Sequence, residues 1–177
     1  MSVAVIGLGR AGLPLAAVIA GSGLKVVGVD LDAEKCEKIN RGKDPIPEEP
    51  GLDELIKKHG GHDLIATPRY EDAVNGNTFI ILVPLFIDET NNPDFSILEL
   101  AIRDLGKILK KGDLVVLETT VPPMTTETLV RKWLEEESGL ALRLIEGCYR
   151  DVNIGLANEF FKMANELGID FTKRGSM

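Results

Sequence analysis

The sequence predicts an α/β protein with a doubly wound, mainly parallel β-sheet that carries helices on both faces. Residues 3–6 form a short apolar run of β-type residues, which suits a strand buried on both faces. A glycine-rich turn, an apolar helical stretch and a second strand pattern follow directly. Further apolar runs at 78–83 and 114–117 are separated by a helical pattern, and this alternation is typical of a parallel sheet.

Composition restricts the broad class of protein. With 177 residues and 44% hydrophobic content, the chain is long enough for one domain with a sizeable core. A net charge of −8 argues against a nucleic-acid partner, and two histidines offer little for a metal site. Cys36 and Cys148 form no C-x-x-C pair, so a reducing, cytoplasmic setting is expected.

Neither a membrane span nor a signal peptide is expected. No run reaches the roughly 20 apolar residues that a transmembrane helix needs. The apolar N-terminus lacks a basic leader and contains Arg10 and three glycines, which is unlike a signal peptide.

The turn after the first strand carries the motif G-x-G-x-x-G in Gly7, Gly9 and Gly12. In a Rossmann fold the first glycine allows a tight turn, the second lets the backbone approach a pyrophosphate, and the third lets helix and strand pack closely. Arg10 and Ala11 lie between the last two glycines and are expected at the same phosphate site. The following helix would direct free N–H groups and its positive dipole end toward the phosphates.

Asp30 ends the second predicted strand, residues 25–30, about 20 residues after the glycine motif. A carboxylate there is expected to accept the hydroxyl protons of the adenosine ribose of a dinucleotide. The same charge would repel a 2′-phosphate, so NAD is favoured over NADP. The alternative is that Asp30 only caps the next helix, but Asp32 can do that itself.

The middle of the chain continues the alternation of elements. Asp32 is expected to cap a helix, and three prolines make the loop at 44–51 stiff. The elements predicted here are helices at 32–40 and 52–59, a strand at 63–66, a short helix at 70–74 and a central strand at 78–83.

Pro84 must end the central strand, and the polar connection at 85–95 follows a strand's carboxyl end, where loops often cover ligands. Ser96 and Glu99 are expected to form a capping box at the start of a helix reaching about residue 109. Thr125 or Thr126 would cap another helix, ending near residue 137. The remaining predicted elements are strands at 114–117 and 140–145 and a strongly apolar helix at 149–167.

Several motifs in one order carry a family resemblance. They are GLGRAGLP at 7–14, EPGL at 49–52, VP at 83–84 and LKKGDLVVLETTVPPMTTETL at 109–129. Over residues 1–139 the chain resembles the N-terminal domain of the UDP-glucose/GDP-mannose dehydrogenase family, and within it the UDP-N-acetyl-D-mannosamine dehydrogenases. The resemblance implies oxidation of a sugar's C6 alcohol to a carboxylate in two hydride transfers, each to an NAD that this domain holds.

The resemblance also implies roles for residues on the later strands. Val83 and Pro84 would line the adenosine and ribose side of the cofactor. Thr120 would lie near the nicotinamide and the substrate, with Glu118 at the end of its strand. Two departures from the family pattern are Leu85-Phe86 in place of Thr-Pro and Met124 in place of a glycine. A methionine would strain the turn if that glycine needs a positive φ.

The segment at 144–170 resembles the start of the family's central helix, which carries part of the active site and most of the dimer contact. The connecting stretch, with an S-P-E-R motif and a catalytic glutamate, has no counterpart, which indicates an internal deletion near residues 140–147. The prediction is an NAD-binding domain at 1–142 followed by a partial central helix and tail at 143–177. A homodimer is expected to form through residues 149–167.

Several residues that take part in catalysis in the family are replaced or absent in this chain. Arg143 and Gly147 stand where the family has a lysine and an asparagine, and glycine has no amide to stabilise an oxyanion. The family's nucleophilic cysteine loop, G-G-x-C-x-P-K-D, has no match, and Cys148 is interpreted as a thiol at the start of a helix. The chain is therefore expected to bind NAD, to bind a UDP-sugar only when the missing domain is supplied, and not to turn over alone.

Two alternatives remain open. The first is a non-catalytic dimerisation module with a vestigial cofactor site, in which the apolar helix at 149–167 pairs two chains. The second is a methyltransferase that uses S-adenosylmethionine, since that class shares a glycine turn and an acid at a strand end. Gly12 and the VP and TVPP turns count against the methyltransferase.

Overall fold

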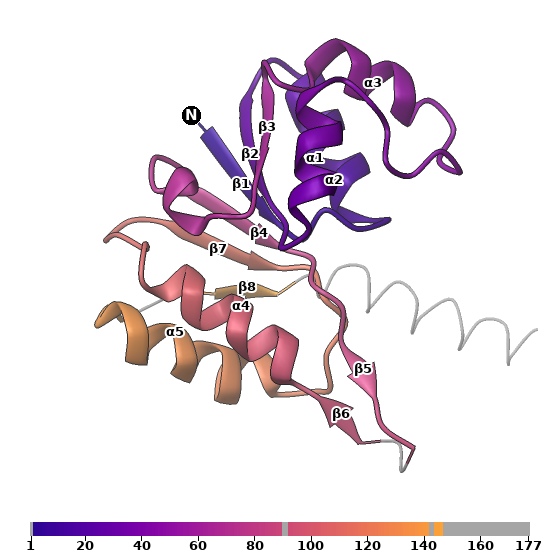
Figure 1. Ribbon diagram of the computed structural model, residues 1–177. Helices are drawn as coiled ribbons and strands as arrows, with labels where there is room; N and C mark the ends of the chain where they lie inside the picture. The colour runs from indigo at the N-terminus through magenta and orange to yellow at the C-terminus, as the bar shows by residue number, and fades with distance from the viewer. Residues whose placement is uncertain (1, 90–91, 142–143, 147–177) are drawn as a thin grey trace, which may run out of the picture. The chain divides into compact units, whose positions relative to one another are not determined.

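A computed structural model describes residues 2–89, 92–141 and 144–146. Its main feature is a six-stranded parallel sheet with the strand order β3-β2-β1-β4-β7-β8 (Figure 1). The strands are β1 (Ser2–Ile6), β2 (Lys25–Val29), β3 (Leu64–Thr67), β4 (Thr78–Ile81), β7 (Leu114–Leu117) and β8 (Leu144–Glu146). This arrangement confirms the predicted fold class.

The chain starts in the middle of the sheet and winds outward in both directions. β1 pairs with β2 on one side, Ile6 opposite Val29, and with β4 on the other, Ile6 opposite Ile81. The order of the strands reverses between β1 and β4, and ligands of open α/β sheets bind beside the carboxyl ends of strands at such a point. The loops that follow β1, β2 and β4 all begin at this edge.

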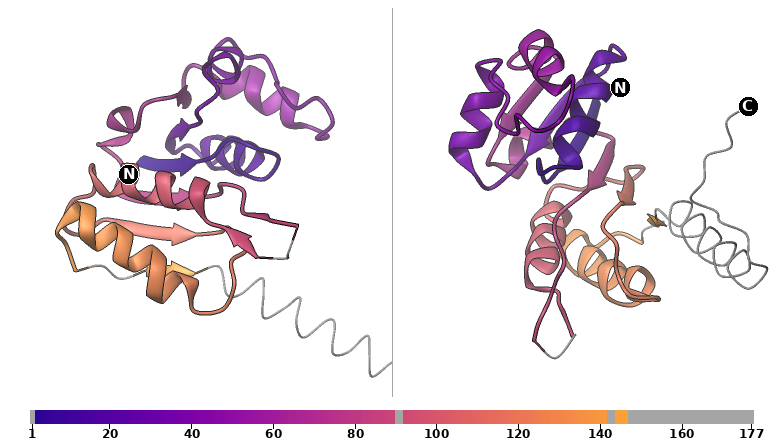
Figure 2. Two further views of the ribbon diagram at one scale, coloured as in Figure 1. Left: turned by 60° about the horizontal axis from the view of Figure 1, so that its bottom comes forward. Right: turned by 90° about the vertical axis from the view of Figure 1, so that its right-hand side faces the viewer.

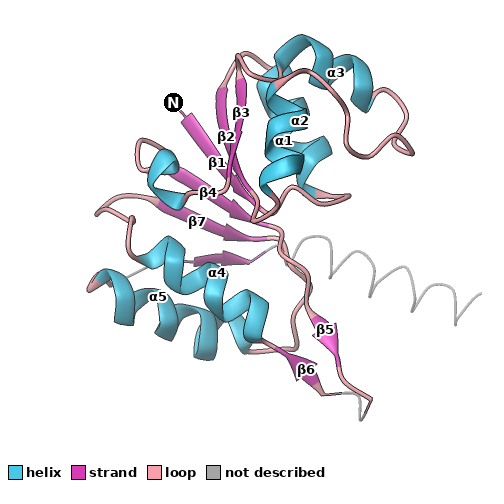
Figure 3. Ribbon diagram, in the orientation of Figure 1, coloured by secondary structure: helices cyan, strands magenta, loops and turns pink. Residues whose placement is uncertain are grey.

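Helices cover both faces of the sheet (Figure 2, Figure 3). Alternate residues of β1 supply the two cores, because successive side chains of a strand point to opposite faces. Val5 packs with the first group of helices and Ala4 with the second. The first group is α1 (Gly12–Gly21), α2 (Ala33–Asn40) and α3 (Leu52–His59); the second is α4 (Ser96–Gly106) and α5 (Arg131–Ser138).

The second layer is joined by both charged and aromatic contacts. Arg103 on α4 forms ion pairs with Glu99 on its own helix and with Glu136 and Glu137 on α5, at 2.8, 3.2 and 2.9 Å. Trp133 of α5 is 7% exposed, and Phe95 meets its ring edge-on with 6.4 Å between the ring centroids. These contacts fix α5 against the start and the last turn of α4.

Two of the three predicted helix caps do not form the expected side-chain hydrogen bonds. α4 has Phe95 at its N-cap position, and the Asp94 carboxylate accepts a hydrogen bond from the Ser96 N–H at 2.9 Å, so the chain enters the helix one residue earlier than the capping box requires. The helix expected from Thr125 or Thr126 begins as a short π-helical segment, η2 (Thr126–Val130), and makes no side-chain cap bond. Thr126 is buried there and its hydroxyl oxygen has no hydrogen-bond partner.

The connection at 85–95 has more structure than the sequence indicates. It contains a two-stranded antiparallel ribbon, β5 (Phe86–Ile87) and β6 (Pro93–Asp94), which extends away from the main sheet (Figure 1). The predicted short helix at 70–74 is confirmed as a 3₁₀ turn, η1 (Tyr70–Ala73).

Some expectations concern residues beyond the described part of the chain. The compact unit with the sheet continues to Glu146. The apolar helix at 149–167, Arg143, Gly147 and Cys148 lie outside the described residues, and the division at 142 and 143 stays a prediction. Within the described residues, no helix is both long enough and apolar enough to cross a membrane.

Candidate dinucleotide-binding site

A cavity of about 400 Å³ lies at the carboxyl edge of the sheet, where the strand order reverses. The loop after β1, the ends of β2 and β4, and one face of α4 form its walls. Five of the predicted site residues line it: Gly7, Gly9, Asp30, Val83 and Pro84. The carboxyl ends of β1, β2 and β4 therefore bring together residues that are more than 70 positions apart in the sequence.

Gly7 makes the tight turn that the motif predicts. Its φ of +95° lies in the region that only glycine adopts readily, and a Cβ there would lie 2.7 Å from the carbonyl oxygen of Leu82. The Gly7 N–H donates to the Val29 carbonyl at 2.8 Å. The turn is thus held between the two strands that flank β1.

The other two glycines have opposite surroundings. A Cβ on Gly12 would lie 1.8 Å from the Gly7 carbonyl oxygen, so the start of α1 packs directly on the turn. A Cβ on Gly9 would meet no atom within 4 Å. The space beside Gly9 therefore opens into the cavity, where another group can come close to the backbone.

The amino end of α1 is suited to an anion. Ala11 is the N-cap residue, and its methyl group cannot accept a hydrogen bond from the first turn. The first turn contains no acidic side chain. In this turn Pro14 has no N–H and the Leu13 N–H donates to the Gly9 carbonyl at 3.0 Å, so what remains for an anion is chiefly the positive end of the helix dipole, which no side chain of the turn neutralises.

The Asp30 carboxylate already accepts several hydrogen bonds from within the protein. One carboxylate oxygen accepts from the Leu8 N–H and pairs with the Lys35 ammonium, both at 2.9 Å. The other accepts from the Asp32 N–H at 3.0 Å, and the side chain is 13% exposed. Asp32 itself caps α2 by accepting from the Lys35 N–H. Asp30 therefore ties the glycine turn to the start of α2, and the expectation that Asp32 is the cap is confirmed.

Cys36 lies directly behind this carboxylate. Its thiol donates to the Asp30 carbonyl, with 3.4 Å between sulfur and oxygen. Burial raises the pKa of the Cys36 thiol, and the negative charge of Asp30 raises it further. The thiol consequently stays protonated near neutral pH and acts as a packing group.

Other predicted residues do not line the cavity. Arg10 turns outward and pairs with Glu48 at 3.0 Å, with both side chains largely exposed. Gly12 and Ala11 lie at the helix start behind the turn, and Glu118 and Thr120 are not among the lining residues. Between the last two, the Thr119 hydroxyl donates to the Val83 carbonyl at 2.8 Å. The turn after β7 is thereby attached to the cavity wall without forming part of it.

Met124 in the same turn has a φ of +69°, the one positive φ of a non-glycine residue in the described part of the chain. The position therefore needs the conformation that glycine adopts freely, as the departure from the family pattern indicated. Its side chain is 66% exposed.

Several lining residues were missed by the sequence analysis. Lys35 is on α2, Tyr70 is on η1, and α4 contributes a face of four residues at helical spacing: Ile97, Leu100, Ala101 and Asp104. The helical spacing was visible in the sequence, but it looks like an ordinary core-facing stripe. Only the position of α4 beside the end of β2 makes that face part of a cavity.

These features define a dinucleotide-binding domain of the Rossmann type: a glycine turn opening a helix, an acid at the end of the next strand, and a cavity at the point where the strand order reverses. A model of the NAD binding domain of the UDP-glucose/GDP-mannose dehydrogenase family matches residues 1–171. The chain belongs to this family, and the cofactor of the matched domain is NAD.

The similar proteins are nucleotide-sugar dehydrogenases. The UDP-N-acetyl-D-mannosamine dehydrogenase of Pyrococcus horikoshii is 33% identical over 96% of this chain and 55% of its own length. The enzyme of the same name from Campylobacter jejuni is 45% identical over 76% of this chain and 32% of its own. A solved structure of a P. horikoshii UDP-D-ManNAc dehydrogenase is 40% identical, with a TM-score of 0.75 over 82% of this chain and 34% of that one.

A ternary complex of GDP-mannose dehydrogenase from Pseudomonas aeruginosa has a TM-score of 0.76 and 27% identity over 82% of this chain and 35% of that one. The chain thus spans about half or less of the length of these relatives. The alignment with the first P. horikoshii relative extends over 236 residues, more than the 177 of this chain. The relative therefore has residues within the aligned region that this chain lacks, in agreement with the predicted internal deletion.

Proposed function

We propose that the cavity binds NAD with its pyrophosphate at the amino end of α1, beside Gly9, and its adenosine ribose at Asp30. One observation carries the proposal: the open side of Gly9 and the Asp30 carboxylate border the same cavity. The two groups have the chemistry that a pyrophosphate and a ribose require, a helix amino end for the anion and a carboxylate for the hydroxyls.

The remaining residues support this geometry in different ways. Gly7 and Gly12 shape the turn, and Ala11 keeps the helix start free of a side-chain cap. Val83 and Pro84 form the wall on the adenosine side. Lys35 neutralises part of the charge of Asp30 and can itself bind a ribose hydroxyl.

Arg10, Thr120 and Glu118 are proposed to contribute from outside the cavity wall. Arg10 follows Gly9 directly, so a rotation away from Glu48 would bring its charge toward the pyrophosphate. Thr120 and Glu118 follow β7, on the side of the cavity that the nicotinamide half of the cofactor would approach.

The whole-protein activity that fits this domain is that of a nucleotide-sugar 6-dehydrogenase of the UDP-N-acetylmannosamine or UDP-glucose type. Bound NAD supplies the hydride acceptor for oxidation of the sugar's C6 alcohol. The chain matches about half or less of these longer relatives, so we propose that this domain binds NAD and that turnover and UDP-sugar binding need the further segments that the relatives contain. Homodimerisation through residues 149–167 and a cytoplasmic location, based on the sequence pattern and cysteine content, belong to the same proposal.

Calorimetric titration of the full chain with NAD tests the binding proposal. Asp30→Ala removes a charged hydrogen-bond acceptor, so we expect NAD affinity to fall about tenfold or more. Cys148→Ala and the exposed Asp53→Ala are expected to leave the affinity unchanged. Because Asp30 also ties the glycine turn, the thermal unfolding of each variant is measured in parallel.

Parallel titrations separate the alternatives. Binding of S-adenosylmethionine in place of NAD would support the methyltransferase. A dimer without NAD affinity in analytical ultracentrifugation would support the dimerisation module. A well-folded Asp30→Ala variant that binds NAD as tightly as the unchanged chain would contradict the ribose role of Asp30.

A further inference from the structure

The end of the cavity beyond Asp30 has a distinct shape. Leu31, directly after Asp30, lines the cavity together with Ile97 and Leu100 of α4. Leu31 and Leu100 are both largely exposed apolar side chains. Apolar side chains lining one cavity suit a flat aromatic ring, which can be buried against them without unpaired polar groups.

Two polar side chains lie at this end. Asp104 is one helical turn beyond Leu100 on the same face of α4, and Tyr70 comes from η1; both line the cavity. One oxygen of the Asp104 carboxylate accepts from the Lys107 ammonium at 2.7 Å, and the Asp104 side chain is 44% exposed. A carboxylate has up to four acceptor positions, so this bond leaves capacity for another donor.

Tyr70 supplies a donor beside this acceptor. Burial raises the pKa of the Tyr70 hydroxyl, and the nearby charges of Asp104 and Asp30 raise it further. The phenol therefore remains protonated throughout the physiological range. The cavity end thus combines a carboxylate that only accepts with a hydroxyl that can donate.

The bound dinucleotide would place its base here. With the pyrophosphate beside Gly9 and the ribose at Asp30, as proposed above, the base extends past Asp30 toward α4. Adenine presents an exocyclic amine, which donates, next to ring nitrogens, which accept. This pattern is complementary to a carboxylate next to a phenol hydroxyl.

We propose that Asp104 accepts a hydrogen bond from the exocyclic amine of the cofactor's adenine and that Tyr70 donates to an adjacent ring nitrogen, so that this site selects adenine over 6-oxo purines. The inference rests on the proposed NAD site and adds base recognition to it. In hypoxanthine and guanine an oxygen replaces the amine, and its lone pairs would face the Asp104 carboxylate. At the position that faces Asp104, a donor is thus replaced by an acceptor, and the protonated ring nitrogen beside it can no longer accept from Tyr70, so both contacts of adenine are lost.

The test compares NAD with nicotinamide hypoxanthine dinucleotide, in which an oxygen replaces the amine and the adjacent ring nitrogen carries a proton. Both are titrated into the full chain by calorimetry. We expect the unchanged chain to bind NAD about tenfold more tightly, because a well-placed base contact discriminates by about that factor or more. In Asp104→Asn the side-chain amide can donate to the oxygen, so the preference should fall to about one or invert.

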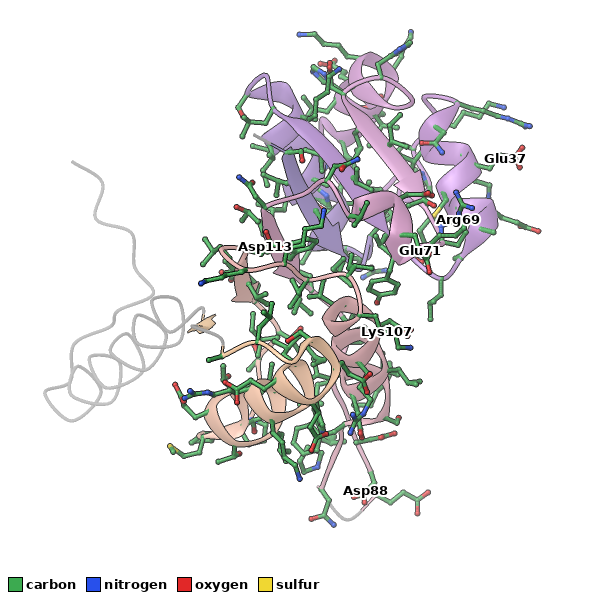
Figure 4. The ribbon with its side chains drawn as sticks, turned by 90° about the vertical axis from the view of Figure 1, so that its left-hand side faces the viewer. Glu37, Arg69, Glu71, Asp88, Lys107 and Asp113 are labelled. Carbon is green, nitrogen blue, oxygen red and sulfur yellow. The ribbon has the colours of Figure 1, made fainter. Side chains whose placement is uncertain are left out.

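Lys107→Met is the matched control, since it breaks the same ion pair and leaves the carboxylate in place. Figure 4 shows Lys107, directly after α4, toward the side on which Glu71 lies, and the charge of Glu71 contributes to the raised pKa of Lys107 after the larger effects of Asp104 and Glu137. We expect this variant to keep the preference for NAD. Asp53→Asn, on the exposed side of α3, should keep it as well.

The possible outcomes distinguish the two proposals. If the unchanged chain binds neither dinucleotide, the NAD proposal fails and the base recognition fails with it. If it binds NAD but binds the hypoxanthine analogue equally well, only the base recognition is overturned. The same holds if Asp104→Asn, folded and binding NAD, retains the full preference, or if Lys107→Met loses it.

Discussion

At the scale of single residues, two glycines of the turn have different roles: Gly12 is needed for stability and Gly9 for cofactor binding. Gly12 has no room for a Cβ, whereas the space beside Gly9 is open and its φ is not positive. We expect Gly12→Ala to lower the free energy of unfolding by about 1–3 kcal/mol, the usual cost of overpacking a tight contact. Gly9→Ala should change it by less than about 0.5 kcal/mol, as a surface substitution does, yet weaken NAD binding.

Urea unfolding and NAD titration of both variants check this prediction. The useful comparison is between two identical chemical changes three residues apart. Equal losses of stability would show that the open side of Gly9 is not tolerant of a methyl group. Undiminished NAD binding by Gly9→Ala would remove the pyrophosphate from this position.

Met124 offers the opposite case, in which the natural residue is the strained one. Its φ of +69° costs a side-chain-bearing residue about 1 kcal/mol, and its exposed side chain contributes little packing. Met124→Gly is therefore expected to raise the free energy of unfolding by about 1 kcal/mol.

Met124→Ala serves as the control, because it shortens the side chain and keeps the Cβ. Its stability should stay within about 0.5 kcal/mol of the unchanged chain in the same urea titration. If alanine stabilises as much as glycine, the side chain rather than the backbone conformation is the source of the strain.

Some residues of the site could be predicted from the sequence and others could not. Gly7, Gly9, Gly12 and Asp30 were predictable because each answers a geometric need that few residue types meet at a fixed spacing. Lys35, Tyr70 and Asp104 have no such signature, since their position in the cavity depends on how elements distant in the sequence pack together.

At the scale of secondary-structure elements, Asp63 joins three of them. Just before β3, its carboxylate binds the Lys25 ammonium of β2 at 2.7 Å and the His59 ring of α3 at 3.0 Å. The hydrogen bonds from Lys25 and His59 hold the pKa of Asp63 below its ordinary value. Asp63 thus stabilises the amino-end edge of the sheet in its ionised form.

The sign of the resulting pH dependence follows from the lowered pKa. The contribution of Asp63 is complete above the ordinary carboxyl pKa of about 4 and is lost as the pH falls through the lower folded value. Asp63→Asn should therefore be less stable than the unchanged chain near pH 6, and the difference should shrink toward pH 3. Urea titrations at several pH values measure it, with Asp53→Asn as an exposed control; a difference independent of pH would contradict the role of the charge.

The elements themselves were largely predictable, and their ends were not. Continuous apolar runs identified the core strands correctly, because strands buried on both faces have no polar alternation. The cap of α4 was wrong, and Thr125 stands at the N-cap position of η2 without forming a side-chain bond, because Ser and Thr are good cap residues on composition alone. In the structure, the backbone enters α4 after the β5–β6 ribbon and enters η2 after a strained turn, and neither path was visible in the sequence.

At the scale of the whole molecule, the sheet order and the two layers follow from the alternation of strands and helices. The family membership and the gap relative to longer relatives were also readable, because motifs in a fixed order identify which segments are present. The charge partners of Asp30 could not be predicted, since a carboxylate at a strand end can serve a ligand, a helix cap or the neighbouring loop, and Asp30 already contacts two of these.

The packing of Trp133 against Phe95 gives the protein an intrinsic optical reporter, because Trp133 is the sole tryptophan of the chain. Its emission senses the α4–α5 layer, whereas the layer of α1, α2 and α3 contains no indole. Tryptophan fluorescence therefore reports unfolding of the α4–α5 layer, whereas far-ultraviolet circular dichroism reports the helices and strands of both layers. Superimposable denaturation curves from the two signals would indicate that both layers melt as one cooperative unit.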